Sequence, residues 1–256
     1  MRTDYTEVFR DPDAVNKYAE EVYAEGSFSS VVSARQEQWL RGFVAQAFAT
    51  PPVQHDFACG TGRAMRMLDG VVAAAHGYDT SEAMLDKARD LGTPGRLHVV
   101  SETGPLPTSD ERPAVVTMFR LLLNASEPVR DRALDFAAGM LPDTAAGLLI
   151  CENHGSASSL RHLRALFGRT DPEWFAELRH SDVVGLLGRH GFEVVARQGF
   201  TMLTRGCYER APLSWVAPGL DDLVSRRRWL ARYATDVVYI ARRRRPRRVR
   251  PRQPVL

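Results

Sequence analysis

A run of small residues, Ala58 to Gly62 (ACGTG), stands at the end of the first predicted strand, Val53–Ala58. Small side chains at a turn between a strand and a helix let a ligand approach the backbone closely. A dinucleotide-binding fingerprint that started at Gly60 would need glycine or alanine at position 65, where the chain has Met65. The turn therefore predicts a ligand site and disfavours a dinucleotide pyrophosphate.

Polar side chains follow the carboxyl ends of the first three predicted strands. Asp56 ends the first strand, where it could face the positively charged amino group of an amino-acid-bearing ligand. Asp79 ends the second strand, 19 residues after Gly60, and its carboxylate could accept hydrogen bonds from two ribose hydroxyls. An alternative for Asp79 is an ordinary cap of the helix that follows. Ser101 and Glu102 follow the third strand and would lie beside an adenine edge, because open α/β sheets bind ligands across these strand ends.

These residues must be positioned by alternating strands and helices, and the apolar pattern predicts that arrangement. Apolar runs alternate with amphipathic stretches in the order expected of a parallel sheet covered by helices. The predicted strands are Val53–Ala58, Ala74–Tyr78, Leu97–Val100, Val115–Phe119, Gly147–Cys151, Phe192–Arg197 and Asp236–Ala241. The predicted helices are Val15–Tyr23, Val32–Phe48, Gly62–Asp69, Ser81–Arg89, Pro128–Leu141, Ser158–Phe167, Ser181–His190 and Leu220–Leu230.

Two motifs carry a resemblance to a known family. They are D-x-A-C-G-T-G at Asp56 to Gly62 and G-Y-D-x-S-x-x-M-L at Gly77 to Leu85. With them the chain resembles the class I methyltransferases that depend on S-adenosylmethionine (SAM), over roughly Val53 to Glu152. The family's first glycine is replaced here by Ala58, a small change that leaves room for a ligand.

The resemblance implies a fold, a cofactor and a set of contacts. The fold is an α/β, Rossmann-like, doubly wound and mostly parallel seven-stranded sheet with a reversed last strand, and N-terminal helices form a lid. The cofactor is SAM. The residues expected to bind it are Asp56, Ala58, Cys59, Gly60, Gly62, Asp79, Thr80, Met84, Ser101, Glu102 and Phe119.

The acceptor side offers fewer candidates. Arg120 and Asn124 follow the fourth strand, where family members often contact cofactor and substrate, and Tyr23 belongs to the predicted lid. His154 follows the fifth strand, so its imidazole is expected to bind substrate and to remove a proton from a hydroxyl or an amine. The alternatives are a loop histidine bonded to a backbone carbonyl, and catalysis by alignment of the reactants alone.

Composition limits the function classes. The formal charge of +3 conceals eight arginines in Arg242 to Leu256, which leave 26 basic against 31 acidic residues in positions 1–241. An acidic body does not favour a nucleic-acid partner. The charged N-terminus lacks the pattern of a secretory signal and no long apolar run occurs, so we expect a soluble, cytoplasmic protein without a membrane span. Three scattered cysteines predict reduced thiols, and no compact metal-ligand cluster is visible, so no metal is expected.

These patterns predict an N-terminal helical lid (1–50), a SAM-binding domain (51–241) with a substrate-side insertion near 199–233, and a disordered arginine-rich tail (242–256). The predicted function is methyl transfer from SAM to an oxygen, nitrogen or carbon nucleophile of a small molecule, by a monomer or a homodimer. Alternatives are an RNA or protein methyltransferase guided by the basic tail, and a SAM-binding partner subunit without turnover.

Overall fold

The computed structural model describes residues 11, 14–15, 28–141, 147–159, 178–203, 207–208, 213–225, 227 and 229–244. Within these residues, no helix is both long enough and apolar enough to cross a membrane. The predicted helix Val15–Tyr23, and with it Tyr23, lies outside this part of the chain except at Val15. The helix expected at Ser158–Phe167 likewise lies outside it beyond residue 159.

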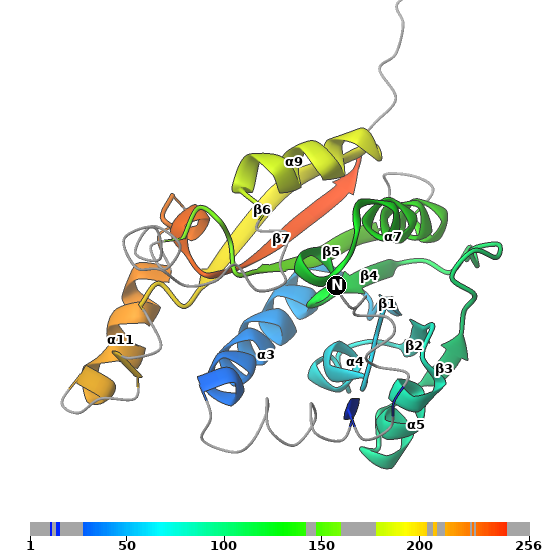
Figure 1. Ribbon diagram of the computed structural model, residues 1–256, viewed down its shortest axis with the longest axis horizontal. Coiled ribbons are helices and arrows are strands. Elements are labelled where there is room, and N and C mark those ends of the chain that lie inside the picture. Colours follow the sequence, from blue (N-terminus) through cyan, green and yellow to red (C-terminus); the bar gives the residue numbers. More distant parts are fainter. Residues whose placement is uncertain are drawn as a thin grey trace, which may run out of the picture.

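A seven-stranded sheet forms the centre of the molecule, in the order β3-β2-β1-β4-β5-β7-β6 (Figure 1). The strands are β1 (Val53–Phe57), β2 (Ala74–Asp79), β3 (Arg96–Val99), β4 (Ala114–Met118), β5 (Gly147–His154), β6 (Phe192–Phe200) and β7 (Asp236–Arg243). The pairs β1–β2, β2–β3, β1–β4 and β4–β5 are parallel, whereas β7 runs antiparallel to both β5 and β6. The sheet and its reversed last strand confirm the predicted fold class.

Helices cover both faces of the sheet (Figure 1). They are α3 (Phe28–Ala47), α4 (Arg63–Met67), α5 (Glu82–Asp90), α6 (Leu121–Asn124), α7 (Glu127–Met140), α9 (His180–Arg189) and α11 (Leu213–Ser225), with a 3-10 turn at Ala231–Tyr233. Successive strand residues point to opposite faces. Val116 therefore belongs to the core cluster that includes Phe136 of α7, whereas Val115 belongs to the cluster that includes Leu40 of α3.

Several element boundaries differ from the predicted ones: α3 begins at Phe28, β6 ends at Phe200 and α11 ends at Ser225, and further differences concern β5, β7 and the start of α11. Strand β5 continues to His154, three residues past its predicted end, because β7 pairs with it along its whole second half. Strand β7 continues to Arg243 because β6 pairs with its last two residues, so the first two residues of the expected tail are strand. Helix α11 begins at Leu213, seven residues before its predicted start.

The described part of the expected N-terminal lid packs on the sheet. Trp39 of α3 stacks on Phe43 and meets Phe200 of β6 edge to face, with ring centroids 5.2 and 5.9 Å apart. The buried side chains of α3 include Leu40 and Val44, which belong to the core. Helix α3 is therefore a covering helix of the sheet, and its apolar stripe accounts for that position.

Candidate cofactor site

The turn after β1 has an unusual backbone. Ala58, Gly60 and Gly62 have φ angles of +53°, +53° and +78°, in the left-handed region that glycine tolerates and other residues adopt at a cost. A Cβ atom on Gly62 would lie 2.3 Å from Cγ2 of Thr93, so this position also lacks space for a side chain. At Gly60 the nearest atom to such a Cβ is Sδ of Met84, at 3.9 Å. Conformation therefore favours glycine at both positions, and space requires it only at Gly62.

Asp79 joins this turn to the end of β2. Its Oδ2 accepts a hydrogen bond from the Gly60 backbone N–H at 2.7 Å, and its Oδ1 accepts one from Ser81 N–H at 2.9 Å. Burial raises the pKa of Asp79, while these backbone donors oppose the shift. The N-cap of α5 is Ser81, whose Oγ accepts a hydrogen bond from Met84 N–H at 3.2 Å. Asp79 is therefore not the helix cap that the alternative interpretation required.

Asp56 is the second carboxylate of the site, and only 2% of its surface is exposed. Its Oδ1 accepts a hydrogen bond from the Thr117 hydroxyl at 2.6 Å. Burial raises the pKa of Asp56 to about 7, the Thr117 bond and Arg63 lower it, and Asp79 raises it. No cationic side chain in the described residues lies within ion-pair distance of Asp56. A positively charged ligand group would therefore meet a carboxylate that it can hold in the charged form.

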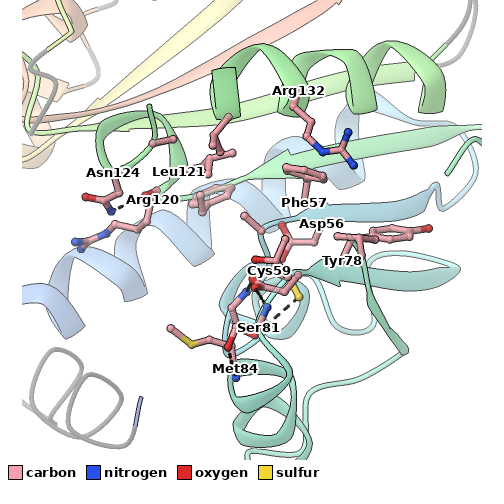
Figure 2. A pocket seen from close by; sticks show the side chains of 18 of the residues that line it. Asp56, Phe57, Cys59, Tyr78, Ser81, Met84, Arg120, Leu121, Asn124 and Arg132 are labelled. Carbon is pink, nitrogen blue, oxygen red and sulfur yellow. Dashed lines mark hydrogen bonds between the residues drawn. The ribbon is translucent and has the colours of Figure 1, made fainter. Parts of the chain in front are cut away.

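These groups line a cavity of about 390 Å³ (Figure 2). Its volume lies within the range of small-ligand sites. Among its lining residues are twelve that the sequence predicted: Asp56, Ala58, Cys59, Gly60, Asp79, Thr80, Met84, Ser101, Glu102, Phe119, Arg120 and Asn124. Gly62 and His154 do not line it. None of the lining residues comes from α3, so the described part of the expected lid does not cover this cavity.

Arg63 is a cavity residue that the sequence reasoning missed. It is the first residue of α4, and its guanidinium lies 5.2 Å from the ring centroid of Phe119. Its Nη1 donates to Oε1 of Gln36 at 3.0 Å, and its Nη2 donates to Oε2 of Glu152 at 3.1 Å. The only local feature of the sequence that indicates Arg63 is its positive charge directly after the glycine turn. Its partners lie 27 and 89 residues away, so no local pattern could reveal them.

Glu152, 1% exposed, is the centre of a buried polar network. Its Oε1 accepts a hydrogen bond from Gln36 Nε2 at 2.6 Å, and its Oε2 accepts one from the Arg120 backbone N–H at 3.1 Å as well as the bond from Arg63. Arg120 has a left-handed backbone, with φ of +61°. Asn124 Nδ2 donates to the Arg120 carbonyl at 2.7 Å. The network thus joins the cofactor cavity to the end of β5.

His154 lies at the far side of this network. Its Nδ1 contacts Oδ1 of Asp236, a buried residue of β7. Glu152, His154 and Asp236 each bring one ligand-type atom within 4.8 Å of the others, which corrects the expectation that no compact cluster exists. The cluster was not visible in the sequence because Asp236 comes from a distant strand. Both oxygens of Glu152 already accept hydrogen bonds, one of them from the positively charged Arg63, so the set is poorly suited to a cation.

Residues 55–142 match the family model described as a methyltransferase domain. The chain therefore carries a methyltransferase domain over these residues. A solved structure of magnesium protoporphyrin IX methyltransferase from Synechocystis that is bound to SAM has a TM-score of 0.55 at 14% identity and covers 91% of this chain and 98% of its own. No curated protein matches the chain.

Solved structures with the same fold align with nearly the whole chain. Magnesium protoporphyrin IX methyltransferase from Synechocystis, bound to S-adenosylhomocysteine (SAH), has a TM-score of 0.58 at 15% identity and covers 93% of this chain and 97% of its own. A possible histamine N-methyltransferase from Thermotoga maritima has a TM-score of 0.58 at 16% identity, with 93% and 99% covered. The [4+2]-cyclase SpnF has a TM-score of 0.52 at 19% identity, with 86% and 83% covered. At these identities the likeness concerns the fold of the methyltransferase domain.

Proposed function

We propose that the protein transfers a methyl group from SAM to an oxygen, nitrogen or carbon nucleophile of a small molecule. The observation that carries the proposal is the cavity itself, whose lining brings the carboxylates of Asp56 and Asp79 and the guanidinium of Arg63 together at the ends of parallel strands. SAM supplies an electrophilic methyl group on a positively charged sulfur. The acidic body of the chain, with 26 basic against 31 acidic residues in positions 1–241, supports a small acceptor over a nucleic acid.

The cavity residues fit the chemical groups of SAM. Asp79 would accept hydrogen bonds from the ribose hydroxyls, because it lines the cavity and each of its oxygens keeps a lone pair beyond the one that accepts from the Gly60 or Ser81 N–H. Asp56 would receive the ammonium group, and Arg63 the carboxylate of the methionine portion. Ser101 and Glu102 line the same cavity beside the end of β3, where an adenine edge would lie.

Arg120 and Asn124 are the residues assigned to the acceptor. Both line the cavity, and Asn124 Nδ2 is held by the Arg120 carbonyl. Asn124 Oδ1 is buried and has no hydrogen-bond partner among the residues of the structure that are described. A buried amide oxygen of this kind is costly to leave unpaired, so a donor group of the acceptor would be favoured there. Alignment of acceptor and cofactor by these groups contributes to the rate through proximity.

Calorimetric titration with SAM and SAH tests the proposal. Binding of both, followed by conversion of SAM to SAH in the presence of an accepted small molecule, is expected. The conversion is the necessary readout, because the fold is shared with a [4+2]-cyclase. A folded protein that binds neither compound would overturn the proposal.

A further inference from the structure

Two polar side chains, Gln54 of β1 and Thr117 of β4, lie inside the parallel sheet beside Asp56. Both are 0% exposed. Strands that are covered on both faces usually carry apolar residues, because burial of a polar group without its hydrogen bonds is costly. Gln54 Oε1 has no hydrogen-bond partner in the described residues, so the amide is buried at a cost. Packing alone therefore does not account for these two side chains.

A relay of hydrogen bonds connects Gln54 to Asp56 through Thr117. Gln54 and Asp56 are two residues apart on β1 and so point to the same face of the sheet, while the parallel register pairs Asp56 with Thr117. Gln54 Nε2 donates to Thr117 Oγ1 at 3.0 Å, and the Thr117 hydroxyl donates to Asp56 Oδ1 at 2.6 Å. A hydroxyl has a single proton to donate. The amide therefore occupies an acceptor position of the hydroxyl and leaves that proton for the carboxylate.

The relay ends on one oxygen of Asp56 and leaves the other for a ligand. Asp56 lines the cofactor cavity, and no second hydrogen bond to its carboxylate occurs among the residues that the structure describes. The charged and titratable groups around it are Arg63 of α4, Asp79 of β2 and Cys59 of the glycine turn. Burial raises the pKa of Cys59 well above its usual value, so this thiol stays neutral. Thr117 and Arg63 therefore favour the charged form of Asp56, against the effects of burial and of Asp79.

We propose that Gln54 and Thr117 are positioning residues for the cofactor, which hold Asp56 charged and oriented toward the ammonium group of SAM. The inference rests on the proposed function, in which Asp56 receives that group. Because the donors follow one another from the amide to the carboxylate, each bond polarises the next, and the hydroxyl donates more strongly than it would alone. The relay thereby selects ligands that carry the amino-acid portion over nucleosides that lack it.

A neutral donor suits this task better than a cation would. A cation in contact with Asp56 would form an ion pair and compete with the ammonium group of the ligand. The Thr117 hydroxyl instead favours the negative charge from within the sheet, and it leaves the cavity side of Asp56 open to the ligand. The hydroxyl and the ligand can thus bind the same carboxylate at once.

Carbon-13 NMR of the aspartate carboxyl groups tests the relay in the unliganded protein, and Asp56→Asn identifies the signal of Asp56. Thr117→Val keeps the shape of the side chain and loses the hydroxyl. We expect the pKa of Asp56 to rise from about 7 by roughly one pH unit, because the hydroxyl bond lowers it. Thr117→Ser, which keeps a hydroxyl, should restore the parent value. An unchanged pKa in Thr117→Val would overturn the inference.

Calorimetric titration with SAH and with 5′-methylthioadenosine, which lacks the amino-acid portion, tests the effect on the cofactor. Near pH 6, Thr117→Val should bind SAH about tenfold more weakly than the parent, and the difference should narrow to about twofold near pH 8, because more of Asp56 is then charged in both proteins. Affinity for 5′-methylthioadenosine should not change. A loss of equal size at every pH, or an equal loss for both ligands, would mean that Thr117 only shapes the cavity and would overturn the inference. Failure of the parent to bind either ligand would instead overturn the proposed function.

Two further variants separate the relay from a general effect of buried polar residues. Gln54→Met removes the amide that orients the Thr117 hydroxyl, so the pH profile of SAH affinity should shift in the same direction by a smaller amount. Thr201→Val is the matched control, because Thr201 donates a similar bond of 2.8 Å to buried Asp236 and neither of these two residues lines the cavity. The control should keep the parent profile. A parent profile in Gln54→Met would overturn the role of Gln54, and a shifted profile in Thr201→Val would overturn the relay as its cause.

Discussion

Asp79 and Gly60, 19 residues apart, are joined by a hydrogen bond of 2.7 Å from the Gly60 backbone N–H to Oδ2 of Asp79. The bond ties the turn after β1 to the end of β2, and the parallel register of the two strands brings these ends together. One carboxylate therefore both shapes the glycine turn and faces the cavity that the turn borders.

Replacing Asp79 with Asn tests the ribose contact. The amide keeps the size of the side chain but loses the charge that strengthens hydrogen bonds to hydroxyl donors. We expect affinity for SAM and SAH to fall roughly 10- to 100-fold, because hydrogen bonds to charged groups contribute about 1.5–3 kcal/mol. Calorimetry measures the loss. Asp86→Asn, on an exposed position of the neighbouring helix, is the control and should bind as the parent does. Unchanged affinity in Asp79→Asn would exclude the ribose assignment.

The pH dependence of cofactor affinity tests Asp56. Burial raises the pKa of this carboxyl to about 7, so in the unliganded protein it gains a proton as the pH falls through neutrality. Only the charged form attracts an ammonium group. Affinity for SAH should therefore increase by up to about tenfold per pH unit as the pH rises toward about 7, and should level off above that pH. The ligand 5′-methylthioadenosine, which lacks the amino-acid portion, should show no such slope. Equal slopes for both ligands would contradict the assignment.

The raised pKa of Asp56 also affects the stability of the unliganded protein, which should decrease with rising pH where the affinity for SAH increases. Because the folded-state pKa of Asp56 lies above the unfolded-state value, the folded state binds more protons between the two values. The contribution of Asp56 to stability is thus present at low pH and is lost as the pH rises through about 7. Urea denaturation of the parent and of Asp56→Asn at several pH values measures it. The variant should lack this component, and identical pH profiles would contradict the raised pKa.

Sequence patterns could predict the cofactor half of the site because it is local. Asp56 and Asp79 lie at the carboxyl ends of β1 and β2, and Ser101 follows β3, and parallel strands bring their carboxyl ends to one edge. Arg63 and its partners Gln36 and Glu152 could not be predicted as a group, since they lie on α3, α4 and β5. Their contacts depend on how the helices pack on the sheet, which periodicity does not specify.

The position of His154, which was expected on the acceptor side of the site, was less predictable because it depends on the pairing of distant strands. His154 was expected in a loop after the fifth strand, but it is the last residue of β5 and pairs with Asp236. The register of an antiparallel pair depends on the residues at both strands and on the long connection between them. A single sequence therefore indicated the strand at Asp236 and left its partner undetermined.

The proposed contact between Arg63 and the methionine carboxylate can be tested with SAH and 5′-methylthioadenosine. Arg63→Gln removes the charge proposed to bind the methionine carboxylate, so affinity for SAH should fall about 10- to 100-fold. Affinity for 5′-methylthioadenosine should change little. Because the substitution also removes the nearer cation of buried Glu152 and leaves only Arg120, at 3.9 Å, the double variant Arg63→Gln/Glu152→Gln is the control for stability. If both ligands lose the same affinity in the double variant, Arg63 shapes the cavity and does not bind the carboxylate.

A comparison of alanine substitutions at Gly62 and Gly70 separates the steric requirement for glycine in the turn from the requirement for a left-handed backbone. Gly62 and Gly70 both have left-handed backbones, with φ of +78° and +71°. A Cβ on Gly62 would lie 2.3 Å from Thr93, whereas a Cβ on Gly70 would meet nothing within 4 Å. Gly70→Ala should therefore cost only the conformational penalty of about 1–2 kcal/mol.

Gly62→Ala must add the displacement of Thr93 to that penalty, so its loss should reach about 3–5 kcal/mol. Thr93 in turn accepts a hydrogen bond from Arg66 at 2.6 Å and donates one to the Thr61 carbonyl at 3.2 Å, so the displacement would disturb the glycine turn itself. Urea denaturation measures the free energy of unfolding of both variants, and the two values are comparable when the free energy depends on urea concentration with the same slope. SAH affinity should fall in Gly62→Ala alone. Equal losses of stability in both variants would mean that Thr93 moves freely and that the turn requires only the backbone conformation.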